Sequence, residues 1–178
     1  MNPSLVADFL LHRGLSRLRQ LRMGVLPAVR LSGTRKRSQE GGVPMVSELE
    51  LVVRSTEIDV NGHVNNAKYL EYLEWGREDW YERAGLDYSA FLEMGIQTVT
   101  VNVNINYRRE CVQGDRLTVR THPRRAGRTS YVLKQELVDA AGVVRADAEV
   151  TSVCMDAAER RSRELPDRLR EALQAVDA

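Results

Sequence analysis

Residues 57–77 of the chain read E-I-D-V-N-G-H-V-N-N-A-K-Y-L-E-Y-L-E-W-G-R. An acid, an amide and an imidazole come first, at Asp59, Asn61 and His63, and a glycine among them allows a tight turn. The uninterrupted pattern that follows predicts a helix over residues 66–84, with Asn65 or Asn66 as its N-cap. The first turn of a helix carries unpaired N–H groups and favours negative charge. The sequence therefore predicts an acid close to the positive end of a helix.

The same residues also fit a simpler interpretation, in which an Asn-rich and Asp-rich turn leads into a capped helix and the polar side chains serve only the backbone. The order of the residues favours a functional site instead. The pattern D-x-N-x-H-V-N-N-x-x-Y-L-x-Y-x-E-x-x-R resembles the signature of the hotdog-fold thioesterases. It is similar both to the 4-hydroxybenzoyl-CoA thioesterase-like acyl-CoA thioesterases and to the plant acyl-carrier-protein thioesterases.

The rest of the chain predicts a sheet. Alternating or apolar runs indicate strands over residues 48–56, 97–107, 117–121, 130–138 and 143–155, with short helices over residues 88–93 and 167–176. One helix cannot cover both faces of such a sheet, and the sheet has exposed edges, so we expect oligomerisation. The resemblance implies the hotdog fold, an α+β fold in which an antiparallel sheet of about five strands wraps around one long central helix. It also implies a homodimer or homotetramer.

Composition and charge divide the chain. Its 178 residues are 43% hydrophobic and 29% charged, which is typical of one globular domain with an extension. Residues 1–47 carry eight basic and two acidic residues, whereas the remainder has a net charge of −5. We therefore predict a basic extension over residues 1–45, disordered or partly helical, a hotdog thioesterase domain over residues 46–160 and a C-terminal helix over residues 161–178.

The role of the extension stays open between three interpretations. It fits an organelle transit peptide, a basic helix that touches an anionic surface or nucleic acid, or an upstream extension of the reading frame with Met45 as the working start. Only one helix is visible before a linker rich in Gly and Pro, so we do not expect a nucleic-acid partner. No apolar run is long enough to cross a bilayer, so no membrane span is expected either.

The sequence offers no metal or cofactor motif. Cys111 and Cys154 are far apart and lack metal-ligand spacing, and no pair of the three histidines is spaced to chelate a metal. We expect reduced thiols in a cytoplasmic protein, with organelle targeting by the basic segment as the alternative.

The predicted chemistry is thioester hydrolysis. Backbone N–H groups at Val64, Asn65 and Asn66 would stabilise the oxyanion of a carbonyl lying at the helix start. Asp59 would attack that carbonyl or deprotonate a water, and a thiol with a pKa of about 8.5 leaves without strong acid assistance. His63 would orient Asp59 or the water, or protonate the departing sulfur, and Asn61 would hold the water or the carboxylate. In the thioesterases that the chain resembles, the acid at the Asp59 position is the catalytic carboxylate.

A second basic group predicts a place for the substrate. Arg124, Arg125 and Arg128 surround a predicted turn and suit the phosphates of coenzyme A, with help from Arg108 and Arg109; a solvated hairpin is the alternative. The leading prediction is thus an enzyme that cleaves acyl-CoA to a free acid and CoA. An acyl-carrier-protein thioesterase and a non-catalytic module that senses acyl-CoA are the alternatives.

Overall fold

The computed structural model describes residues 46–173, so the predicted basic extension and the last residues of the predicted C-terminal helix lie outside the described part. The elements are β1 (Ser47–Val52), the 3-10 helix η2 (Ser55–Glu57), α1 (Asn66–Arg83), α2 (Tyr88–Glu93), β2 (Ile96–Tyr107), β3 (Arg116–Ala126), β4 (Ser130–Asp139), β5 (Val144–Asp156) and α3 (Asp167–Leu173).

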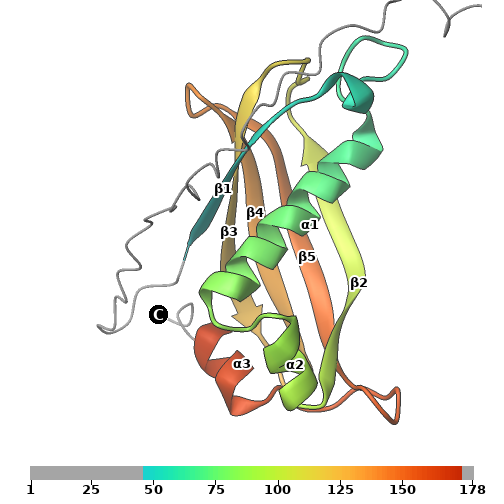
Figure 1. Ribbon diagram of the computed structural model, residues 1–178, viewed down its shortest axis with the longest axis vertical. Coiled ribbons are helices and arrows are strands. Elements are labelled where there is room, and N and C mark those ends of the chain that lie inside the picture. The colour runs from blue at the N-terminus through green and yellow to red at the C-terminus, as the bar shows by residue number, and fades with distance from the viewer. Residues whose placement is uncertain (1–45, 174–178) are drawn as a thin grey trace, which may run out of the picture. The chain divides into compact units, whose positions relative to one another are not determined.

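The five strands form one sheet in the order β1-β3-β4-β5-β2, and every neighbouring pair is antiparallel. Helix α1 runs across one face of this sheet, with α2 and α3 at its lower end in Figure 1. The predicted arrangement, five antiparallel strands against one long helix, is confirmed.

Helix α1 begins where the sequence predicts. The side chain of Asn65 accepts a hydrogen bond from the Ala67 N–H at 2.9 Å, which is the N-cap geometry. Its buried face consists of Tyr69, Tyr72, Leu73, Gly76 and Trp80. Leu70 has helical spacing with Leu73, yet it is 41% exposed, because Tyr69 and Tyr72 occupy the buried face instead.

Gly76 is where the helix lies closest to the sheet. A Cβ atom there would clash with the Val119 side chain and would lie 3.1 Å from the Thr121 hydroxyl. Val119 and Thr121 are buried on β3, so α1 packs directly on the sheet at this strand. A glycine within a helix costs stability, and this close approach of the helix backbone to the sheet is the physical reason for it here.

Within residues 46–173, two element boundaries differ from the prediction by more than one residue. β1 ends at Val52 rather than continuing to residue 56, because the Glu57 carboxylate accepts the Arg54 N–H and turns the chain into η2. β3 continues through Arg124 and Arg125, with a bulge between Pro123 and Arg125. Only residues 127–129 therefore form the turn that precedes β4.

The buried side chains form two clusters under α1. One cluster lies beneath the first half of the helix and consists of Val53, Val64, Tyr69, Tyr72, Leu73, Cys111, Leu117, Val119, Leu137, Ala146 and Ala148. The other lies at the end that carries α3 and consists of Trp80, Leu86, Ile96, Tyr131, Leu133, Cys154, Leu165, Leu169 and Leu173. The C-terminal helix thus packs on the sheet domain, and the loop that precedes α1 lies over the first cluster.

Candidate active site

The chain between η2 and α1 forms a small closed loop. The Asp59 N–H donates to the His63 carbonyl at 2.9 Å, the Gly62 N–H donates to the Asp59 carbonyl at 3.1 Å, and Ile58 pairs with Val64. Gly62 has a φ of +82°, a conformation that side chains disfavour. These bonds hold the predicted catalytic residues in one fixed turn at the start of α1.

The turn brings Asp59 and His63 together. Oδ1 of Asp59 accepts the Asn61 N–H at 2.8 Å and lies 3.6 Å from His63 Nδ1. The Asp59 side chain is 18% exposed and that of His63 37%, so both can meet a substrate. The 3.6 Å separation is an ion-pair distance rather than a hydrogen bond. Asn61 acts on the carboxylate through its main chain, and the residue is exposed.

The three predicted oxyanion donors are not equivalent. The Val64 N–H donates to the Cys111 carbonyl at 2.8 Å, and the Asn65 N–H donates to the Glu57 carbonyl at 2.9 Å. Both groups are thus engaged, which corrects the prediction for Val64 and Asn65. The Asn66 N–H, the first of the helix, has no acceptor within residues 46–173. Of the three predicted oxyanion donors, the Asn66 N–H is therefore the one that remains a candidate.

A pocket of about 470 Å³ opens over this turn. It is lined by Asp59, Asn61, His63, Val64, Asn66, Tyr69, Tyr107, Arg108, Arg109 and Glu110. The structure thus gathers five of the six predicted catalytic and oxyanion residues around one pocket, while the sixth, Asn65, is absent from its lining.

Two tyrosines form part of the pocket wall. The side chain of Tyr69 is buried in the core, yet it also lines the pocket. Burial raises the pKa of its hydroxyl, which therefore stays protonated. Tyr107 stands edge-on to Tyr69 at 5.1 Å between ring centres, and its hydroxyl donates to the Asn66 carbonyl at 3.2 Å.

Two further residues of the pocket wall, Tyr107 and Glu110, were not among the predicted site residues. Tyr107 is the last residue of the clearest predicted strand and Glu110 follows shortly after it, and polar or aromatic residues at a strand end are a signal that could have found them. Their place beside Asp59 depends on long-range contacts such as the bond between Val64 and Cys111, which spans 47 positions and leaves no local pattern.

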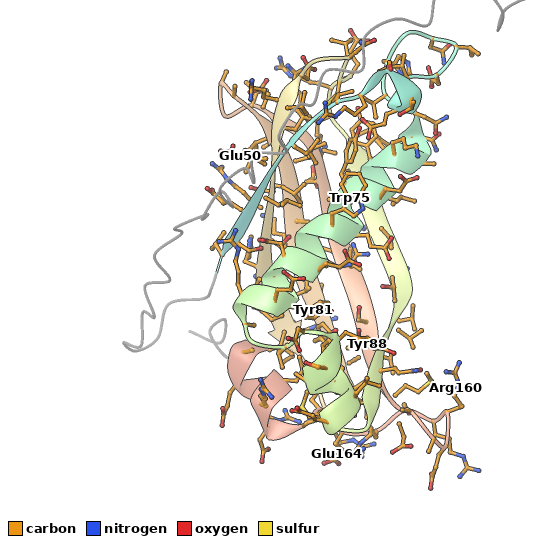
Figure 2. The ribbon with its side chains drawn as sticks, in the orientation of Figure 1. Glu50, Trp75, Tyr81, Tyr88, Arg160 and Glu164 are labelled. Atoms are coloured by element: carbon orange, nitrogen blue, oxygen red, sulfur yellow. The ribbon has the colours of Figure 1, made fainter. Side chains whose placement is uncertain are left out.

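The predicted CoA-binding arginines lie elsewhere in the chain's fold. Arg124 pairs with Glu149 at 3.9 Å, and Arg128 pairs with Glu164 at 3.1 Å. Glu164 lies at the lower end in Figure 2, whereas the loop before α1 lies at the upper end in Figure 1. One chain does not bring Arg124, Arg125 and Arg128 to Asp59. Arg108 and Arg109 do line the pocket, although Arg108 is bonded to Asp147 at 2.5 Å.

Within residues 46–173, no group of three or more His, Cys, Asp or Glu side chains is placed to hold a metal ion. No helix in that range combines the length and the apolar character that crossing a membrane requires. Cys111 and Cys154 are buried free thiols, and burial raises the pKa of each. The cytoplasmic location inferred from them stays a prediction.

Comparison with known proteins points to one fold and one family. Over residues 53–173, the sequence matches the thioesterase-like superfamily. It is 38% identical to the long-chain acyl-CoA thioesterase FadM of Escherichia coli over 130 residues, which cover 72% of this chain and 98% of FadM.

Solved structures agree. The crystal structure of YbaW, a probable thioesterase from Escherichia coli, is 36% identical with a TM-score of 0.65, covering 74% of this chain and 98% of that one. Slr0204, a 1,4-dihydroxy-2-naphthoyl-CoA thioesterase from Synechocystis, superposes with a TM-score of 0.67 at 22% identity, covering 75% of this chain and 99% of that one, and so supports the fold alone.

The fold is the hotdog fold of the thioesterases, as predicted. The chain belongs to the thioesterase-like superfamily.

Proposed function

We propose that the chain is a thioester hydrolase that cleaves acyl-CoA to a free carboxylic acid and CoA. The observation that carries the proposal is the pocket at the start of α1, because both the Asp59 carboxylate and the Asn66 residue line it. Membership of the family and the 38% identity to FadM support the substrate class.

The Asn66 N–H is the proposed oxyanion donor. It belongs to the first residue of an 18-residue helix, where the backbone dipoles favour negative charge. A substrate carbonyl placed at this N–H would gain stabilisation as its oxygen becomes negative, whereas the planar ground state would gain less. The Tyr107 hydroxyl on the Asn66 carbonyl fixes the orientation of this part of the chain.

Asp59 supplies the attack. Its Oδ1 is held by the Asn61 N–H, while its Oδ2 has no partner within residues 46–173 and is the oxygen available for chemistry. In one route Oδ2 adds to the carbonyl carbon, the C–S bond breaks with its electron pair on sulfur, and water hydrolyses the resulting anhydride. In the other route Oδ2 takes a proton from water, whose oxygen adds to the carbon before the same bond breaks.

His63 has an orienting role in either route. Its Nδ1 lies 3.6 Å from Asp59 Oδ1 and 3.4 Å from the Val64 carbonyl, so the ring stands against the carboxylate and faces the pocket. The thiolate leaves readily because its conjugate acid has a pKa of about 8.5. The proton that His63 can give to sulfur is therefore an assistance rather than a requirement.

The proposed assembly is a homodimer or homotetramer that contains a pair of β2 strands. β2 is an edge of the sheet, and Val99, Val101, Val103 and Tyr107 on it are exposed. Twelve residues of unpaired edge bearing apolar side chains favour pairing with another strand. A second copy of β2 matches this edge in length and character.

Such a pair of β2 strands would bring the predicted CoA-binding arginines of one chain toward the predicted catalytic residues of the other. When two β2 strands pair antiparallel, the lower end of one sheet lies beside the upper end of the other. The β3–β4 turn, which carries Arg128, is at the lower end. The partner's Arg124, Arg125 and Arg128 would then share an end of the sheet with Asp59, where they would meet the phosphates of CoA.

The test is thiol release from a panel of acyl-CoA thioesters, with acyl-carrier-protein thioesters as a second panel. Wild type should release thiol, and Asp59→Asn should lose at least about 100-fold in kcat, because the amide neither attacks nor takes a proton. Asp79→Asn is the matched control, since Asp79 pairs with Arg83 on the surface of α1 at 2.7 Å. Undiminished turnover by Asp59→Asn would overturn the mechanism.

Two further outcomes discriminate between functions. Binding of acyl-CoA without thiol release would support a sensing module instead. A single turnover in heavy-oxygen water separates the two routes, because a general base puts the label into the product acid at once. Direct attack, followed by hydrolysis at the Asp59 carboxyl carbon, leaves the label in the protein.

A further inference from the structure

Glu57 is the only charged side chain that is buried within residues 46–173, with 8% of its surface exposed. Burying a carboxyl group away from water is costly unless hydrogen bonds compensate. Here one oxygen, Oε2, accepts two of them, from the Tyr72 hydroxyl at 2.8 Å and from the Arg54 N–H. Neither Glu57 nor Tyr72 lines the pocket, so the pair does not touch a substrate.

The main chain of Glu57 makes a second connection. Its carbonyl accepts the Asn65 N–H at 2.9 Å, immediately before the first residue of α1. The neighbouring residues Ile58 and Val64 form an antiparallel β-bridge across the loop. Glu57 thus lies where the closed loop begins, two residues before Asp59. It is paired with Asn65, the residue immediately before Asn66.

Tyr72 provides a rigid anchor for this base. Its side chain is completely buried in the second turn of α1, and its ring lies 6.3 Å from that of Tyr69 and 5.6 Å from that of Trp75. The hydroxyl can therefore hold Glu57 in only one place. Through this bond the loop is fixed to the second turn of the helix as well as to its start.

We propose that Glu57 and Tyr72 together form a positioning device, which sets the distance between the Asp59 carboxylate and the Asn66 N–H. The inference rests on the proposed function, since it concerns how the same two groups reach one thioester. A displacement of about 1 Å between reacting groups costs up to 100-fold in rate. The buried hydrogen bond between Glu57 and Tyr72 should therefore affect turnover more than substrate binding.

Three variants separate the effect of the Glu57 acceptor oxygen from the effect of the Glu57 charge. Tyr72→Phe and Glu57→Leu each remove the bond, and we expect kcat to fall about tenfold or more while KM stays within about twofold. Glu57→Gln keeps an oxygen that accepts both hydrogen bonds, so kcat should stay within about threefold of wild type. The double variant Glu57→Leu with Tyr72→Phe should be no slower than the slower single variant, because both remove one interaction.

Tyr81→Phe is the matched control for Tyr72→Phe. It deletes a hydroxyl from the same helix, there bonded to the Tyr131 hydroxyl and away from the pocket. All rates are measured on the full chain, well below each variant's melting temperature, so that loss of folded protein does not enter kcat. Tyr81→Phe should lose thermal stability yet keep the kcat of wild type.

The outcomes are distinguishable. Folded Glu57→Leu and Tyr72→Phe with the kcat of wild type would overturn the positioning role and leave the proposed function intact. Glu57→Gln as slow as Glu57→Leu would overturn it too, because charge rather than the acceptor would then matter. A wild type that releases no thiol from any acyl-CoA would overturn the proposed function, and the positioning role with it.

Discussion

The main-chain N–H of Asn66 can be removed without breaking the helix. Asn66 is the first residue of α1, where proline is well tolerated, and the preceding Asn65 has φ −57° and ψ 135°, which suits a residue before proline. Asn66→Pro should therefore fold, with a loss of stability of at most about 1 kcal/mol. Its kcat should fall by about 100- to 1,000-fold, the usual cost of deleting one oxyanion donor. Steady-state kinetics alongside urea unfolding measures both.

Asn66→Ala is the control for this substitution. It removes the side chain and keeps the N–H, so its activity should fall far less than that of Asn66→Pro. Equal losses in the two variants would show that the side chain, and not the main-chain donor, serves the reaction.

At the scale of single residues, the sequence singled out candidate residues that the structure places around one pocket, but not how they are bonded. The pattern around Asp59 predicted the acid, the histidine and the helix start, because all three are set by a few neighbouring residues. The pattern did not distinguish Asn66 from Val64 and Asn65. The difference arises because the Val64 N–H donates to the Cys111 carbonyl and the Asn65 N–H to the Glu57 carbonyl, and these bonds are seen only in the folded chain. The partnership of Glu57 with Tyr72, 15 positions away, was equally invisible.

Among the elements, α1 depends on its glycine. Gly76→Ala should improve intrinsic helix propensity by about 1 kcal/mol, yet the added methyl would run into the Val119 side chain. We expect net destabilisation of about 1–3 kcal/mol, as is usual for overpacking a well-packed core. Chemical denaturation of the purified variant measures the free energy of unfolding.

A second substitution tests the stated cause. Gly76→Ala combined with Val119→Ala should be more stable than the two single losses added together predict, because the second change makes room for the first. Strict additivity would mean that the clash is relieved by a shift of the helix and that Val119 is not the obstacle.

The β4–β5 hairpin carries a stability that depends on pH. Asp139 accepts the Val143 N–H and the Ala141 N–H, both at 2.9 Å, as well as Arg145 Nε at 2.9 Å. These bonds, led by that from Val143, lower the pKa of Asp139. Because the folded pKa is the lower one, the stabilisation is complete above the unfolded value of about 3.9 and is lost as the pH falls through the folded value.

The measurement compares wild type with Asp139→Asn in urea at pH values from 7 to 3. The difference in unfolding free energy should be constant from neutral pH to about 4 and should shrink below that. A difference that stays unchanged down to pH 3 would contradict the assigned cause.

The sequence located these elements better than it located their ends or their faces. Alternation identified every strand, because one side of the sheet is covered by α1. It failed where the register shifts, since the extra residue Val101 in β2 ends the regular alternation there. Strict alternation over residues 97–107 would put Val99, Val101 and Val103 on one face, and this register shift shows that expectation to be wrong. The prediction likewise ended β3 at residue 121 and missed residues 122–126, where the bulge between Pro123 and Arg125 lies.

For the sheet as a whole, the face away from α1 does not require a partner. Alternation on β3 points Arg120 and His122 away from the buried Val119 and Thr121, and Arg120 pairs with Glu48 at 2.9 Å. Lys134 pairs with Glu136 at 3.1 Å on the neighbouring strand. This face carries paired charged side chains, so it can lie against water. Of the two reasons for oligomerisation that the sequence suggested, the uncovered face is therefore removed and the exposed edges remain.

The two edges of the sheet differ in their suitability for pairing. β1 is six residues long and carries Glu48 and Glu50, the latter at the outer edge in Figure 2, and such charges discourage a partner strand. β2 is twelve residues long, about 40 Å, and has exposed valines. The expected contact between copies is therefore through β2.

Val101→Glu tests this contact, because the residue is 57% exposed on β2 and a two-fold contact would bring two new charges close together. Light scattering should show wild type as a dimer or tetramer and the variant at half that mass or less. Val46→Glu, at a residue 52% exposed before the other edge strand, should leave the mass unchanged. If the partner's Arg128 binds CoA phosphates, the dissociated variant should also show a raised KM for acyl-CoA. A monomeric wild type with full activity would instead mean that one chain holds the complete site.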